Sequence, residues 1–166
     1  MIKMMIAVNS KDEGKRLLEY FGQKPDIEVI GVEYDGQGAY DRILLSKPDI
    51  VLMNMILPEL DGLGIMEKLM ENLEVPKLPR VIIISSVDNP VIMDCACQSG
   101  ADYYVMKPYR LETLYNRVLQ LHKPLRENGL RDVRSYETCQ RGGQERMDAE
   151  AYLETEITNV MRRIGV

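Results

Sequence analysis

The sequence contains five short apolar runs separated by segments with helical periodicity, and this pattern limits the folds that it can adopt. The runs are "KMMIAV" (3–8), "IEVIGVEY" (27–34), "DIVLMN" (49–54), "RVIIIS" (80–85) and "DYYVM" (102–106). Most are continuous rather than alternating, which is typical of parallel strands whose sheet is covered by helices on both faces. We therefore predict an α/β fold with a doubly wound five-stranded parallel sheet.

Helix starts between these runs are marked by capping residues. Ser10 followed by Glu13 is a capping-box pattern, and Asp61 precedes the amphipathic stretch "LGIMEKLMENL" (63–73). Residues 111–121 place their apolar side chains at spacings of three and four, which predicts a last helix with one core-facing stripe.

The character of the chain changes after residue 121. Residues 122–147 contain few apolar side chains, two adjacent glycines and mixed charge, so we predict a linker. Residues 148–166 recover helical spacing, with Asp148 as a plausible N-cap. The predicted organisation is a domain over 1–121, a linker over 122–147 and a helix over 148–166.

Charge and hydropathy narrow the class of protein. The formal net charge of -5 and the pI near 5.0 argue against a surface devoted to nucleic acid. No apolar run approaches the roughly 18 residues that a membrane span needs, and the first residues lack a secretory signal pattern. We expect a cytoplasmic protein without membrane contact.

Functional residues of a doubly wound sheet are expected at the carboxyl ends of its strands. The side chains that the predicted strands place there are Val8, Asn9, Asn54, Ser85, Ser86, Lys107 and Pro108. With "LPELDG" (57–62) after the third run and "KPY" (107–109) after the fifth, residues 1–121 resemble the receiver domain of bacterial two-component response regulators.

This resemblance implies a flavodoxin-like sheet of strand order 2-1-3-4-5 and a phosphotransfer site. In a working receiver, a pair of acidic residues and an aspartate after the third strand hold Mg²⁺, and that aspartate attacks a phosphohistidine. The resemblance gives Ser85 and Lys107 the phosphoryl-binding positions and Tyr104 the position of the switch aromatic. It also implies a cis peptide between Lys107 and Pro108.

The three carboxylate positions are occupied here by Val8, Asn9 and Asn54. Three carboxylates and a lysine would carry two net negative charges, whereas these four positions carry one net positive charge. We therefore predict that Mg²⁺ binding is lost, that no cofactor is needed, and that the chain is a pseudo-receiver and not an enzyme.

Without a metal, the sequence suggests new partners for the remaining groups. The carbonyl of Asn54 is expected to accept a hydrogen bond from Lys107 or Ser85. Lys107 needs an anionic partner if it is desolvated, and the candidates from nearby loops are Asp12, Glu59 and Asp88.

Three runs narrow the resemblance within the family. They are "EVIGVEYDGQGAY" (28–40), "IVLMNMILPELDGLGIMEKL" (50–69) and "EITNVMRRIGV" (156–166). They resemble the master sporulation regulators of endospore-forming bacteria (stage 0 sporulation protein A type), in which a linker joins the receiver to a helical DNA-binding domain. The recognition helices are not in this sequence, so we expect no DNA binding by this chain.

The leading hypothesis is a regulatory interaction module in sporulation-type transcription control. It would bind itself, a full-length regulator or a kinase through residues 90–99, 102–106 and 111–121, the face that many receivers use to dimerise. One alternative is phosphorylation at a non-standard acceptor, for which the candidates are Asp12, Ser85 and Ser86. Another is an anion or metabolite sensor built from Lys107, Ser85 and loop N–H groups.

Overall fold

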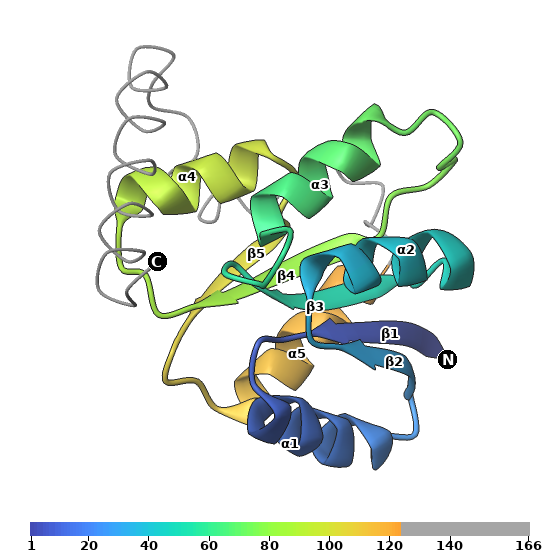
Figure 1. The fold of residues 1–166 in the computed structure, drawn as a ribbon. Coiled ribbons are helices and arrows are strands. Elements are labelled where there is room, and N and C mark those ends of the chain that lie inside the picture. The colour runs from blue at the N-terminus through green and yellow to red at the C-terminus, as the bar shows by residue number, and fades with distance from the viewer. Residues whose placement is uncertain (124–166) are drawn as a thin grey trace.

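The computed structural model describes residues 1–123, and its centre is a parallel five-stranded sheet (Figure 1). The strands are β1 (Ile2–Ala7), β2 (Ile27–Glu33), β3 (Ile50–Asn54), β4 (Arg80–Ser85) and β5 (Tyr103–Met106). Their order is β2-β1-β3-β4-β5, and every neighbouring pair is parallel. The predicted doubly wound, flavodoxin-like fold is confirmed.

Five helices cover the two faces of the sheet. They are α1 (Lys11–Gly22), α2 (Gly36–Ser46), α3 (Gly62–Glu71), α4 (Pro90–Gln98) and α5 (Leu111–His122). Helices α1 and α5 lie on one face, and α2, α3 and α4 lie on the other (Figure 1). The predicted helix over 148–166, and the predicted linker beyond residue 123, lie outside the described residues.

The sheet divides the core into two apolar clusters because successive side chains of a strand point to opposite faces. In β3, for example, Ile50 and Leu52 pack with α1 and α5, whereas Val51 and Met53 pack with the other three helices. All four side chains are fully buried. This double burial explains why the strands appear in the sequence as continuous apolar runs.

The β3–α3 loop is held tightly against the start of α2, which fixes the backbone at the end of β3. The Gly36 N–H donates to the carbonyl of Pro58 at 2.9 Å. A Cβ at Gly36 would overlap the backbone carbonyl of Leu60, so the contact requires glycine. The Gly62 N–H also donates to the carbonyl of Met55 at 2.8 Å, which closes the loop on itself.

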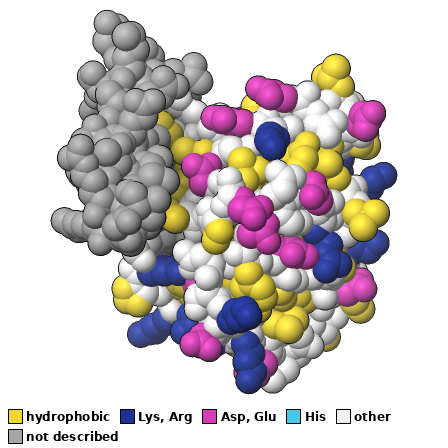
Figure 2. Space-filling view, viewed as in Figure 1, with side chains coloured by type: hydrophobic (Ala, Val, Ile, Leu, Met, Phe, Trp, Pro, Cys, Tyr) yellow, Lys and Arg dark blue, Asp and Glu magenta, His cyan; other side chains and the backbone are white. Residues whose placement is uncertain are grey.

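The face formed by α2 and α3 carries charged side chains interspersed with hydrophobic ones (Figure 2). Within residues 1–123, no helix combines the length and the apolar character that a membrane crossing requires.

Candidate functional site

The carboxyl ends of the strands bring together side chains that are far apart in the sequence. Asn54 ends β3 and Ser85 ends β4, and both are buried. Asn9 and Lys107 lie in the loops that follow β1 and β5. Because all five strands run in the same direction, these loops meet at one edge of the sheet. The Lys107–Pro108 peptide bond is cis.

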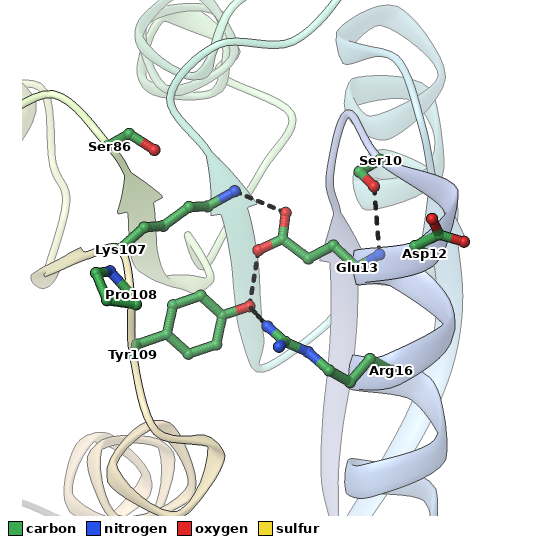
Figure 3. A pocket seen from close by; sticks show the side chains of 8 residues that line it. All are labelled: Ser10, Asp12, Glu13, Arg16, Ser86, Lys107, Pro108 and Tyr109. Carbon is green, nitrogen blue, oxygen red and sulfur yellow. Dashed lines mark hydrogen bonds and ion pairs between the residues drawn. The ribbon is translucent and has the colours of Figure 1, made fainter.

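The centre of this edge is the carboxylate of Glu13, in the first turn of α1 (Figure 3). Its Oε2 accepts from the ammonium of Lys107 at 2.8 Å and from Nδ2 of Asn54 at 3.2 Å. Its Oε1 accepts from the hydroxyl of Tyr109 at 2.7 Å. One carboxylate therefore joins α1 to the end of β3 and to the β5–α5 loop.

Two predictions about local partners are wrong at this point. The anion beside Lys107 is Glu13, whereas the expected candidates Asp12, Glu59 and Asp88 are all exposed. The expected capping box is half formed: the Ser10 hydroxyl accepts from the Glu13 N–H at 3.4 Å, but the Glu13 carboxylate binds distant donors. The reason is physical, because Lys107 and Tyr109 offer charged and partly buried donors that outcompete a solvated backbone N–H.

Asn54 acts as a donor and not, as predicted, as an acceptor. Its Nδ2 donates to Oδ1 of Asn9 at 3.1 Å and to Glu13. Asn9 in turn donates from Nδ2 to the carbonyl of Ile56 at 3.0 Å. Oδ1 of Asn54 is buried without a hydrogen-bond partner among the described residues, so neither Lys107 nor Ser85 donates to it. Two acceptors that face the amide nitrogen impose this orientation.

The charge state of Glu13 reflects its three donors. Burial alone would raise the pKa of this carboxyl, but the hydrogen bonds from Lys107, Tyr109 and Asn54 outweigh it, and the pKa lies below its ordinary value of 4.5. Burial and the hydrogen bond to Glu13 raise the pKa of Tyr109 to about 12. At neutral pH the network therefore contains a carboxylate and a protonated phenol.

The other half of the edge surrounds the β4–α4 loop. The hydroxyl of Ser85 accepts from the Val87 N–H at 3.1 Å, and the hydroxyl of Tyr104 donates to the Val87 carbonyl at 3.0 Å. Burial, the largest cause, raises the pKa of Tyr104, so this phenol also stays protonated at neutral pH. The two hydroxyls therefore bind the N–H and the carbonyl of Val87.

An open pocket of about 590 Å³ lies between α1 and the β5–α5 loop (Figure 3). Its lining residues are Ser10, Asp12, Glu13, Arg16, Ser86, Lys107, Pro108 and Tyr109. Two carboxylates and two cations face this space, so the net positive pocket that the sequence suggested is balanced. The sequence count missed Glu13 because it included only the strand-end positions.

The second cation of the pocket is also engaged within the protein. The guanidinium of Arg16 donates to the Tyr109 hydroxyl at 3.2 Å and lies 5.4 Å from the centroid of that ring. Sequence reasoning missed Glu13, Arg16 and Tyr109 as site residues. Their only signal was position, since a first-turn residue of α1 and the residue after Lys107–Pro108 both border the carboxyl edge.

Comparisons with known proteins identify the family and agree with the fold. A family model described as "Response regulator receiver domain" matches residues 6–119. The receiver domain of the Francisella response regulator 1452 is 25% identical with a TM-score of 0.65, and the alignment covers 73% of this chain and 96% of that one. The activated N-terminal receiver domain of RstA from Klebsiella pneumoniae is also 25% identical, with a TM-score of 0.63 and coverage of 73% and 99%.

A third solved structure shows the same fold at lower identity. The DNA-binding response regulator of the LuxR family from Staphylococcus aureus is 19% identical, with a TM-score of 0.68. The alignment covers 74% of this chain and 100% of that chain.

Proposed function

The chain belongs to the response regulator receiver domain family, and from this premise we propose that it is a pseudo-receiver that signals without phosphorylation. In this role it acts in two-component or phosphorelay signalling by binding other proteins. The observation that carries the proposal is Asn54, a buried amide at the strand end where a receiver needs a nucleophilic aspartate. A neutral amide is a poor nucleophile toward a phosphoryl group.

The surrounding residues support the loss of the metal. Mg²⁺ prefers several hard oxygen ligands in octahedral geometry. Val8 offers no ligand atom and is packed into the apolar cluster beneath α1 and α5. The amide oxygen of Asn9 accepts from Asn54, and Glu13 is paired with Lys107. Among residues 1–123, no three His, Cys, Asp or Glu side chains are grouped closely enough to hold a metal ion. These residues do not fit the family's Mg²⁺ site.

The surface proposed for partners consists of α4, β5 and α5. Asp94 is the only charged residue of α4 (Pro90–Gln98), so this helix offers a nearly neutral surface. Low charge suits the centre of a protein interface. The proposed partners are a second copy of the chain, a full-length regulator or a kinase.

A role in sporulation-related transcription control is the narrowest form of the proposal. It is supported by the three sequence runs that resemble the sporulation regulators. Purified chain mixed with a sporulation regulator and with an unrelated regulator of the same family should form a complex only with the first. Equal binding to both, or to neither, would contradict this part of the proposal.

Mass spectrometry tests the central claim. The purified chain would be incubated with Mg²⁺ and acetyl phosphate, alongside a receiver that has aspartate at the acceptor position. The proposal expects the control to gain one phosphoryl group, and this chain to keep its mass while its native spectrum shows a dimer with or without Mg²⁺. A phosphoryl adduct would sink the proposal, and mapping it to Asp12, Ser85 or Ser86 would establish the alternative acceptor.

A further inference from the structure

We propose that the Glu13 carboxylate is the resident anion of this pocket and excludes free phosphate from Lys107. The inference rests on the proposed function, because it supplies a reason why the site does not respond to phosphate. Glu13 lies in the first turn of α1 and is not one of the strand-end residues from which the site was predicted.

Three donors converge on the one carboxylate of Glu13. Lys107, Tyr109 and Asn54 approach its two oxygens at 2.8, 2.7 and 3.2 Å. They come from the β5–α5 loop and from the end of β3, so the fold assembles them independently of α1. A cation and two neutral donors around a small volume form an anion-binding arrangement. Glu13 occupies that arrangement from within the chain.

The ion pair between Glu13 and Lys107 is largely buried. The Glu13 side chain is only 9% exposed, and that of Lys107 is 29% exposed. The pair is therefore shielded from solvent more than an ordinary surface ion pair, and its attraction is screened less. An incoming anion would have to displace an intramolecular carboxylate that has no translational entropy to lose.

Among the described residues that line the pocket, each cation already has a partner. Lys107 is paired with Glu13, and Arg16 is bonded to Tyr109 and stacked on its ring. Asp12 adds a second carboxylate to the lining. The two carboxylates of the pocket lining balance its two cations, so the pocket does not attract an oxyanion as long as Glu13 remains charged.

A glutamate that excludes phosphate differs from a purely structural one in what happens when its charge is removed. Removal of the charge of Glu13 should leave the Lys107 ammonium without its anion. The side chain of Ser86 lines the same pocket (Figure 3). Inorganic phosphate should then bind and stabilise the folded protein. The wild type should gain no such stabilisation.

The test uses the thermal unfolding midpoint of the full chain in sodium phosphate and in sodium chloride of equal ionic strength. Four proteins are compared: wild type, Glu13→Gln, Glu19→Gln, and the double variant Glu13→Gln/Lys107→Gln. Glu19 is an exposed glutamate on the same helix, so its variant controls for the loss of one negative charge from α1.

For Glu13→Gln we expect a rise that is about 3–6 °C larger than that of wild type, at a phosphate concentration tenfold above its dissociation constant. Wild type, Glu19→Gln and the double variant should share only the rise that phosphate gives folded proteins in general, through its exclusion from their surface. If Glu13→Gln does not fold, Glu13→Asp takes its place, because the shorter side chain withdraws the carboxylate from Lys107 and should give a smaller rise in the same direction.

Three results would overturn the inference. They are a folded Glu13 variant without the additional rise, a wild type that is stabilised as much as the variant, and an additional rise that persists in the double variant. Equal stabilisation of the wild type would favour an anion sensor. An additional rise that persists in the double variant would mean that phosphate binds away from Lys107. The proposed function fails separately, by covalent phosphorylation of the wild type with acetyl phosphate, a reaction that the midpoint experiment does not involve.

Discussion

The two halves of the site edge are held by different kinds of interaction. The α1 side, which comprises Glu13, Asn54, Lys107 and Tyr109, is built around a charged carboxylate whose partners lie 41, 94 and 96 residues away in the sequence. The α4 side, which comprises Ser85, Val87 and Tyr104, is built from neutral hydroxyls that bind one backbone unit.

This difference predicts where substitutions should reduce stability most. On the α1 side, several donors share a single anion, and removal of that anion takes an acceptor from each of them at once. On the α4 side, each hydroxyl contributes one hydrogen bond to a backbone group, and these bonds can be lost one at a time. The α1 side should therefore be more sensitive to mutation, to pH and to salt.

The largest effect is expected for Glu13→Ala. It leaves the Lys107 ammonium without its anion, and it removes the acceptor of the Tyr109 hydroxyl and one of the two acceptors of Asn54 Nδ2. We expect it to lower the free energy of unfolding by about 2–3 kcal/mol. Urea denaturation followed by circular dichroism measures this loss. Glu19→Ala, on the exposed part of the same helix, should change stability by no more than about 0.5 kcal/mol. Equal losses in the two variants would show that the carboxylate of Glu13 stabilises the fold no more than an exposed glutamate of the same helix.

The contribution of Glu13 should also depend on pH. Its pKa in the folded protein is lowered, so its stabilisation is fully present above the ordinary value of 4.5 and is lost as the pH falls through the lower folded value. The stability difference between wild type and Glu13→Gln should therefore shrink below about pH 4.5. A difference that stays constant down to pH 3 would mean that Glu13 stabilises by packing and not by charge.

The second effect concerns Asn54→Asp, the change that restores the acceptor residue of the family. It places a second carboxylate where the amide nitrogen now lies 3.2 Å from Glu13, so we expect a loss of about 1–3 kcal/mol at neutral pH. The same change in a Glu13→Gln background should cost much less, because the like charge is gone.

A double-mutant cycle of Asn54→Asp and Glu13→Gln measures this coupling. A coupling energy of about 1 kcal/mol or more is expected from two groups in direct contact. Additive effects would mean that the two side chains separate when both are charged. In that case the side chains of the α1 side would move more easily than their hydrogen bonds suggest.

The same comparison explains which parts of the structure the sequence could predict. All five strands were predicted within two residues of their observed ends, because a parallel sheet buried on both faces imposes continuous apolar runs that are visible locally. The placement of Asn54, Ser85 and Lys107 at one edge followed from the direction of the strands. Both the strand positions and the placement of these residues follow from the sheet topology, which the short apolar runs of the sequence predict.

The partners of Glu13 could not be predicted in this way. A glutamate three residues after a serine is explained well by a local capping box, so nothing in the sequence called for a distant partner. Which of several nearby carboxylates pairs with Lys107 depends on side-chain reach across 94 residues of chain. The donor role of Asn54 followed from the two acceptors placed around it, a feature of packing that no strand-end pattern contains.

The third effect is expected for Tyr109→Phe, which removes only the hydroxyl between Glu13 and Arg16. We expect a loss of about 1 kcal/mol near pH 7. The folded pKa of Tyr109 is raised to about 12, so the unfolded chain loses its proton first, and wild-type stability should fall as the pH rises from about 10 to about 12. The variant should lose less over this range.

Tyr20→Phe is the control for this measurement, because Tyr20 also lies beside a cation, Lys24, at 4.3 Å from its ring centroid. The phenylalanine ring retains this contact, so Tyr20→Phe should cost much less stability than Tyr109→Phe near pH 7. If Tyr109→Phe cost as little as Tyr20→Phe, the network around Glu13 would not depend on the phenol, and the α1 side would reduce to a simple ion pair.

The smallest effect is expected on the α4 side, for Tyr104→Phe. Loss of the hydroxyl that donates to the Val87 carbonyl should cost about 0.5–1 kcal/mol and speed amide hydrogen exchange in residues 86–89. Tyr103→Phe is the matched control, because its ring lies 4.6 Å from the guanidinium of Arg117 and phenylalanine preserves that contact.

Salt should affect the two sides differently. The stability cost of Glu13→Ala should fall when sodium chloride is raised from about 0.05 to about 0.5 M, because salt screens the attraction between charges. The cost of Tyr104→Phe, which removes a neutral hydrogen bond, should not change. A salt-dependent cost at Tyr104 would mean that charge reaches the β4–α4 loop, and the two halves of the edge would then form one electrostatic unit.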